Sequence, residues 1–157
     1  MRSREDSLEA VTPVEHDDGD IGEINGIVGF HIRLAHGACY RHFTETFVDL
    51  DLTQKQVSVL WLIYDHPGIS QTDLGQRLRM DRATTMTIVN RLQARNYLRR
   101  EKSPSDGRKQ ALYLEPQGEA VLIKARAAIR EHEAWVKGRF TDSEVKTLME
   151  LLARIHE

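Results

Sequence analysis

The fold is decided by residues 69–114, which read ISQTDLGQRLRMDRATTMTIVNRLQARNYLRREKSPSDGRKQALYL. Ser70 has the side chain of an N-cap and predicts a short helix that carries Leu74 and Leu78. Met80-Asp81 predicts a turn and a second N-cap, from which another helix runs to a point near Asn96. Apolar or small side chains recur on one side of this second helix, at Thr85, Ile88, Val89 and Leu92. Two helices joined in this way predict a helix-turn-helix.

A β-hairpin is predicted directly after the second helix. Residues 97–102 and 108–114 flank the polar turn Ser103-Pro104-Ser105-Asp106-Gly107, and turn residues between two short strand-forming runs are typical of a hairpin. A helix-turn-helix followed by a basic hairpin is the order of elements in a winged helix-turn-helix, which we place at residues 51–114.

Helical patterns surround this segment. From Ile21 to about residue 48 the spacing of apolar residues predicts one helix of about seven turns. Thr53-x-x-Gln56 and Thr141-x-x-Glu144 are capping boxes that open further helices, and a helical pattern also follows Pro116. The predicted fold is mainly α with a small β-hairpin wing, a winged helix-turn-helix within a helical dimerisation frame of residues 21–50 and 115–157. Residues 1–20 contain seven acidic side chains and predict a flexible acidic arm.

Charge is distributed unevenly along the 157 residues. The whole chain has a net charge of −2, yet Gln71 to Gln110 holds ten basic against four acidic residues, a net charge of +6. Such a basic block in an acidic chain indicates a polyanionic partner. No Gly-rich phosphate loop, Gly-x-Ser-x-Gly elbow or motif of paired carboxylates is present, so nothing in the sequence predicts an enzyme. The chain also lacks a transmembrane run and a signal peptide, so we expect a cytoplasmic protein with no membrane partner.

Candidate DNA contacts lie on the second helix of the predicted motif and on the hairpin. Donor and acceptor side chains of the kind that contact base edges or phosphates share the exposed helix face: Arg82, Thr84, Thr87, Asn90 and Arg91. The hairpin adds Asp106, Arg108 and Lys109. Arg108 could enter the minor groove, with Asp106 as an ion-pair partner that orients Arg108 or Arg91.

The chain resembles the multiple antibiotic resistance regulator (MarR) family across residues 21–157. The resemblance rests on Leu52-Thr53, Gly68-Ile69-Ser70-Gln71, Asn90-Arg91-Leu92, Asp106-Gly107-Arg108 and Leu114-Glu115-Pro116-Gln117-Gly118. Glu115 replaces the usual threonine, and Asn96 replaces a glycine whose left-handed conformation asparagine tolerates. The resemblance implies an obligate homodimer that binds double-stranded DNA at a near-palindromic operator. It also implies a repressor released by a small aromatic effector bound between the dimerisation region and the winged domain, although activators also occur.

An effector site is predicted on the first two long helices. Its candidate residues combine aromatic rings with cationic groups: His31, Arg33, His36, Tyr40, Arg41, Trp61 and Tyr64. This chemistry suits an aromatic carboxylate or an aromatic acyl-CoA. The resemblance to the family then implies control of an aromatic-compound catabolic or efflux operon. The competing interpretation is that the tryptophan belongs to the core and the charged residues to a solvated helix face.

The single cysteine, Cys39, leaves a second hypothesis for the regulation open, that of a redox sensor. Some members of the resembled family sense peroxides through a cysteine of the first helix, so the resemblance implies that a peroxide-sensing repressor could act through this thiol. The simpler interpretation is a buried cysteine that packs as a small hydrophobe. His31 and His36 are five residues apart and do not share a helix face, so no metal site and no cofactor are predicted.

Overall fold

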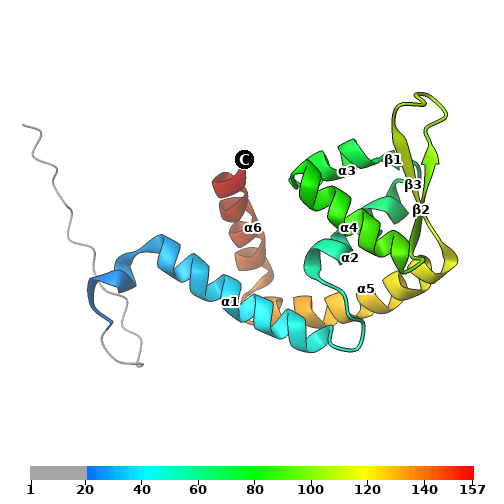
Figure 1. The fold of residues 1–157 in the computed structure, drawn as a ribbon. Helices are drawn as coiled ribbons and strands as arrows, with labels where there is room; N and C mark the ends of the chain where they lie inside the picture. The colour runs from blue at the N-terminus through cyan, green and yellow to red at the C-terminus, as the bar shows by residue number, and fades with distance from the viewer. Residues whose placement is uncertain (1–20) are drawn as a thin grey trace, which may run out of the picture. The chain divides into compact units, whose positions relative to one another are not determined.

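The computed structural model describes residues 21–157, and the predicted acidic arm at residues 1–20 lies outside them. Within these residues the chain divides into two units between Arg41 and His42, inside the first α-helix. The elements in chain order are η1 (Gly22–Gly26), α1 (Val28–Thr46), α2 (Gln54–Asp65), β1 (Ile69–Ser70), α3 (Gln71–Arg77), α4 (Arg82–Ala94), β2 (Leu98–Lys102), β3 (Gln110–Leu114), α5 (Pro116–Lys137) and α6 (Asp142–His156) (Figure 1). The predicted fold class, mainly helical with a small β wing, is confirmed.

The first predicted helix was too long. Residues Gly22–Gly26 form a 3-10 helix, and Ile27 then adopts an extended conformation with φ −92° and ψ 113°, so the α-helix begins only at Val28. Gly22 has φ +71°, a left-handed conformation that glycine adopts without strain. The apolar spacing continues through this break, which is why periodicity alone predicted one continuous helix.

The predicted helix starts are confirmed by their hydrogen bonds. Thr53 and Gln56 form a complete capping box at α2, and Thr141 and Glu144 form another at α6. The Ser70 hydroxyl accepts a hydrogen bond from the backbone N–H of Asp73 at the start of α3. Glu115, which stands where the family usually has threonine, is the N-cap residue of α5. Its side chain makes no capping hydrogen bond.

The wing is part of a three-stranded antiparallel sheet with strand order β1-β3-β2. The hairpin of β2 and β3 pairs Leu98 with Leu114 and Lys102 with Gln110. The two-residue strand β1, which the sequence pattern did not predict, pairs Ile69 with Leu112. Gly68, at φ +86°, lies in the turn that leads from α2 into β1. The sheet therefore ties the start of the helix-turn-helix to the wing.

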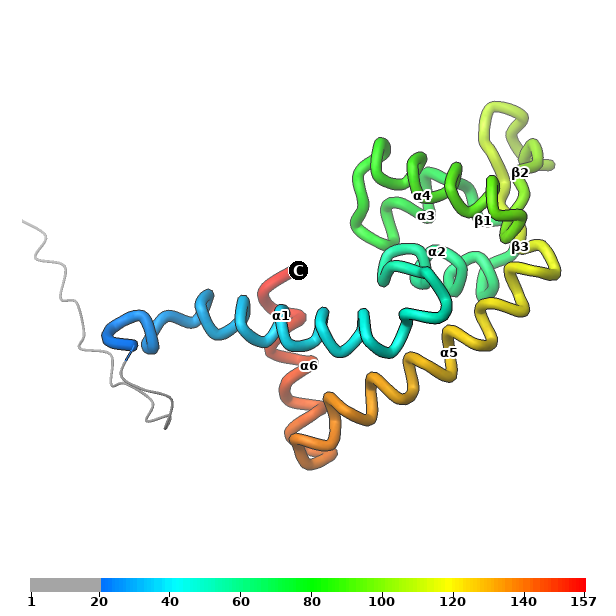
Figure 2. The backbone as a smooth tube through the Cα atoms, turned by 60° about the horizontal axis from the view of Figure 1, so that its bottom comes forward, coloured from blue at the N-terminus to red at the C-terminus, as the bar shows by residue number. Residues whose placement is uncertain are grey.

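The core of residues 42–157 is built around α2. Its buried side chains pack with those of α4 and the sheet, and α5 runs past α2 and β3 (Figure 2). The fully buried members include Leu60, Ile63, Leu74, Val89, Leu92, Leu98, Leu112 and Leu122. This packing fixes α4 and the wing on one rigid scaffold.

Within residues 21–157, no group of three or more His, Cys, Asp or Glu side chains could hold a metal ion. In the same part of the chain, no helix has the length and apolar character needed to cross a membrane.

Candidate nucleic-acid interface

Helix α4 is held with one side against the core and the other toward solvent. Its buried side chains are those predicted, Thr85, Ile88, Val89 and Leu92. The helix begins at Asp81, whose Oδ1 accepts a hydrogen bond from the backbone N–H of Thr84 at 2.7 Å. This bond and a second one from the Thr84 hydroxyl lower the pKa of Asp81, because both stabilise the ionised carboxylate. The cap fixes where the exposed face of α4 starts.

The predicted contacts on α4 differ in their surroundings. Arg82, Thr87, Asn90 and Arg91 are exposed. Thr84 is half-buried, and its hydroxyl donates to Oδ2 of Asp81 at 3.0 Å. The Thr84 hydroxyl therefore already serves the helix cap. As DNA contacts, all five residues stay predictions.

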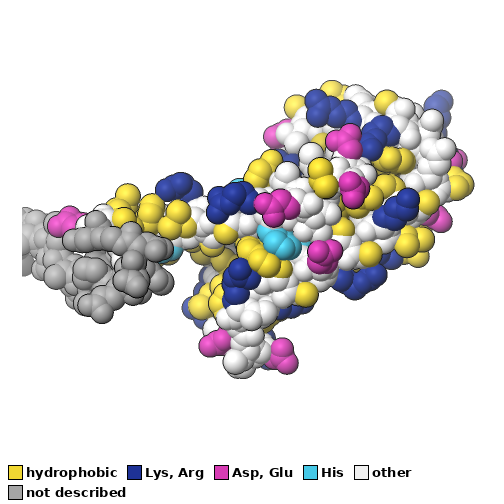
Figure 3. Space-filling model, turned by 90° about the horizontal axis from the view of Figure 1, so that it is seen from below, with side chains coloured by type: hydrophobic (Ala, Val, Ile, Leu, Met, Phe, Trp, Pro, Cys, Tyr) yellow, Lys and Arg dark blue, Asp and Glu magenta, His cyan; other side chains and the backbone are white. Residues whose placement is uncertain are grey.

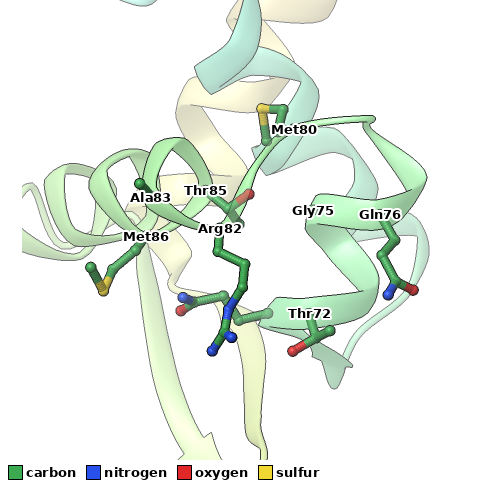
Figure 4. A pocket seen from close by; sticks show the side chains of 9 residues that line it. Thr72, Gly75, Gln76, Met80, Arg82, Ala83, Thr85 and Met86 are labelled. Carbon is green, nitrogen blue, oxygen red and sulfur yellow. The ribbon is translucent and has the colours of Figure 1, made fainter.

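A pocket of about 450 Å³ lies between α3 and α4. Arg82 extends from α4, and Thr72 and Gln76 extend from α3, at the sides of this pocket (Figure 4). The helices approach closely because Gly75 has no side chain, and a Cβ there would lie 2.7 Å from the Thr85 hydroxyl. Met86 also lines the pocket and is exposed, so it adds an apolar group that the sequence reading omitted.

The wing presents its basic side chains at the turn between β2 and β3. Arg108 and Lys109 are both exposed. The predicted ion pair of Asp106 with Arg108 or Arg91 is wrong, since it is not among the ion pairs of residues 21–157. Instead, Oδ1 of Asp106 accepts a hydrogen bond from the backbone N–H of Arg108 at 3.0 Å. Asp106 therefore shapes the turn that carries Arg108, because a short carboxylate reaches the local backbone more readily than a distant guanidinium.

Arg100 also belongs to this surface, although the sequence pattern did not predict it as a functional residue. From β2 its guanidinium donates hydrogen bonds to side chains of both helices of the motif, Asn90 and Gln93 on α4 and Gln71 on α3. Burial lowers the pKa of Arg100. Strand alternation could have indicated this placement, because Arg100 lies two residues after the buried Leu98 and so shares its side of the strand.

Other arginines of the basic block are engaged within the fold. Arg95 donates to the backbone carbonyl of Asp51 at 2.7 Å and lies over the Tyr97 ring. Arg99 forms an ion pair with Glu101 at 2.9 Å, and this hydrogen bond raises the pKa of Arg99. The net charge of the block therefore overstates the number of cations available to phosphates.

The predicted effector residues fall in two places. Trp61 and Tyr64 lie on α2, and the guanidinium of Arg126 on α5, which was not predicted, lies over both rings. The remaining candidates lie on α1: Arg33 covers the Phe30 ring, His36 stacks on Tyr40, and His31 bonds to the Asn25 carbonyl. Arg41 is exposed and Cys39 is half-buried. Their roles in effector binding or redox sensing stay predictions.

These elements define a winged helix-turn-helix DNA-binding protein. The sequence model of the MarR family matches residues 50–109, the winged motif itself. A transcriptional regulatory protein for the hcr operon, from Thauera aromatica, is 30% identical over 136 residues, which cover 86% of this chain and 82% of that one. The chain belongs to the MarR family and is a DNA-binding transcriptional regulator, not an enzyme.

Solved structures share the fold along nearly their whole length. The transcriptional repressor CouR, bound to a 23-mer DNA duplex, aligns with a TM-score of 0.83 and 27% identity over 89% of this chain and 99% of CouR. BpsR of Bordetella bronchiseptica aligns with a TM-score of 0.80 and 26% identity over 88% of this chain and 99% of BpsR. The BpsR structure concerns the regulation of its DNA binding by 6-hydroxynicotinic acid, so a relative responds to a small aromatic ligand.

Proposed function

We propose that this chain is a homodimeric repressor that an aromatic carboxylate, free or as its coenzyme A thioester, releases from a near-palindromic operator. The observation that carries the proposal is the position of Arg126. Its guanidinium carbon lies 4.8 Å from the ring centroid of Trp61 and 4.3 Å from that of Tyr64. Two aromatic rings and one cation together offer what an aromatic acid needs, apolar contact area and a partner for its carboxylate.

The hydrogen bonding of Arg126 supports this role. Its Nη2 lies 3.6 Å from Oδ1 of Asp65, an ion pair too long to be a strong hydrogen bond. Its Nε is buried and has no hydrogen-bond partner among the residues that the structure describes. A buried donor without an acceptor costs about 1–3 kcal/mol, and a ligand carboxylate would supply the acceptor. Because Arg126 joins α5 to α2, a ligand there would act on the helix that underlies the winged motif.

A second copy of the chain is the proposed partner of α6. None of the fifteen residues of this helix is buried, although Met149, Leu151, Leu152 and Ile155 are large and apolar. Hydrophobic side chains are also exposed just before α1, at Ile24 and Ile27, and in its first turns, at Val28 and Ile32 (Figure 3). Apolar helix faces of this kind are typical of a symmetric interface. The 23-mer duplex of the CouR complex spans about two turns of DNA, the length that two copies would cover.

The test is a ligand screen with a duplex that the protein itself selects from a randomised pool. Aromatic acids and their coenzyme A thioesters are ranked by the melting temperature of the free protein and by release of the labelled duplex. A ligand that prefers the free protein must weaken DNA binding by the same factor by which DNA weakens ligand binding. We expect one aromatic class to do both.

Arg126→Gln should abolish this response, whereas the matched variant Arg130→Gln, at an exposed position one turn further along α5, should keep it. An undiminished response in Arg126→Gln would refute the site. If peroxide releases the duplex, no aromatic compound does, and Cys39→Ser prevents the release, the protein is a redox sensor that acts through Cys39 and not an aromatic-responsive repressor.

A further inference from the structure

Arg100 connects three side-chain amides on two helices. From β2, its Nη2 donates to Oδ1 of Asn90 at 2.6 Å, and its Nη1 donates to Oε1 of Gln93. Its Nε and Nη2 both lie 3.3 Å from Oε1 of Gln71, the first residue of α3. Asn90 and Gln93 are exposed on α4, whereas Arg100 is half-buried behind them. The arginine thus holds Asn90, a predicted DNA contact, and the exposed Gln93 one turn further along α4.

The chemistry of the guanidinium decides which way these amides face. Arginine has five N–H donors and no acceptor, so the atom that each amide turns toward Arg100 must be its oxygen. The amide nitrogen of each, with its two N–H donors, is then the atom left for a partner outside the protein. Without Arg100 the amide of Asn90 or Gln93 could turn over and offer either atom.

This orientation bears on which base each amide can read. The bidentate contact of Asn or Gln with adenine uses both amide atoms, the oxygen as acceptor from N6 and the nitrogen as donor to N7. An amide whose oxygen is held by an arginine is poorly placed for that pair. Its donors instead match the acceptor edges in the major groove, O6 and N7 of guanine and O4 of thymine.

We propose that Arg100 is a positioning residue that sets the base preference of α4, by holding Asn90 and Gln93 as hydrogen-bond donors. The proposal rests on the predicted role of α4 as the base-reading helix and on the proposed function as a DNA-binding repressor. Arg100 itself contacts no base. It acts through the two amides and links their orientation to the position of the wing strand.

The experiment compares base preference among variants on the selected duplex and on every single base-pair substitution of it. Arg100→Gln should reduce discrimination by about tenfold at the base pairs opposite α4, with adenine gaining most. Lys109→Gln is the matched control, because it removes one positive charge from the exposed wing tip. It should weaken all duplexes alike and reduce the slope of log affinity against log salt by about one.

The same measurements contain the results that would overturn the proposal. If Arg100→Gln behaves like Lys109→Gln, with uniform weakening and a reduced salt slope, Arg100 is a phosphate contact. An unaltered base preference in Arg100→Gln would also refute a positioning role. Arg100→Lys keeps the charge but loses the planar fork, so it should keep the wild-type salt slope and still relax the base preference.

A double-mutant cycle separates positioning from general damage to the wing. In a chain that already carries Asn90→Ala and Gln93→Ala, Arg100→Gln should no longer change the base preference, because the amides through which it acts are gone. A persistent change would overturn the proposal. If the two alanine substitutions alone leave the wild-type preference intact, Asn90 and Gln93 read no base and the positioning role of Arg100 is refuted, whereas the other predicted contacts of α4 are untouched by that result. Circular dichroism and melting temperature confirm that each variant is folded.

Discussion

The Nδ1 atoms of His42 and His132 lie 2.8 Å apart, a hydrogen bond between two imidazole rings. His42 lies near the end of α1 and stacks on Trp135, with the ring centroids 4.3 Å apart. Such a bond requires a proton on one nitrogen and a lone pair on the other, so the pair cannot hold a proton on both facing atoms. Burial of His132, and then the proximity of His42, lower the pKa of His132, while Glu133 opposes the shift.

Stability should therefore depend on pH through this pair. Because the folded state binds the proton of His132 less tightly than the unfolded state does, stability is greatest above the usual value of about 6.5 and falls as the pH drops through it toward the folded pKa. His132→Gln should reduce the loss of melting temperature on going from about pH 8 to about pH 5. The control is His66→Gln, at an exposed position in the turn after α2. Equal pH dependence in His132→Gln and wild type would contradict the lowered pKa of His132.

Gly118→Ala should destabilise the fold. A Cβ at this position, in the first turn of α5, would lie 2.8 Å from the carbonyl carbon of Tyr97 and closer still to its oxygen. Because the obstacle is backbone, relief requires a shift of α5 against the chain before β2, at a cost of about 2 kcal/mol. Gly29→Ala, where a Cβ meets no other atom within 4 Å, should instead stabilise α1 by about 0.5–1 kcal/mol. Chemical denaturation measures both, and an equal effect of the two substitutions would contradict the close approach.

Arg108→Ala should weaken operator binding and reduce the salt slope by about one, because the exposed wing cation no longer displaces a counterion from the DNA. Fluorescence anisotropy at several salt concentrations measures both quantities. The matched variant Lys124→Ala removes an exposed charge from α5 and should leave the salt slope intact. A wild-type slope in Arg108→Ala would remove the wing tip from the DNA interface.

Leu152→Glu should convert the proposed dimer to a monomer. Leu152 is 43% exposed on α6, and a carboxylate there would be desolvated without a partner if a second copy covered it. Sedimentation equilibrium measures the mass, and binding to a two-half-site duplex should weaken in parallel. Thr147→Glu introduces the same charge at an exposed position of the same helix and serves as the control. A mass unchanged by Leu152→Glu would place the interface elsewhere.

Sequence alone was sufficient wherever the deciding contacts are local. The capping boxes at Thr53 and Thr141 join residues three apart, and both formed as predicted. Asn96 adopts the expected left-handed conformation, with φ +59°. The buried side of α4 followed from its apolar spacing. The order of helices and hairpin, and with it the winged helix-turn-helix, was therefore readable from the chain.

Tertiary structure decided what depends on residues far apart in the chain. Strand β1 has two residues and exists because it pairs with β3, more than forty positions later. Arg126 reaches Trp61 from another helix, and Arg100 reaches Gln71 from the wing strand. Local propensity cannot encode such partners, since their positions are set by the packing of the core between them. The sequence by itself determined that this protein carries a DNA-binding motif, whereas only the folded chain determined which arginines support the structure and which face outward from it.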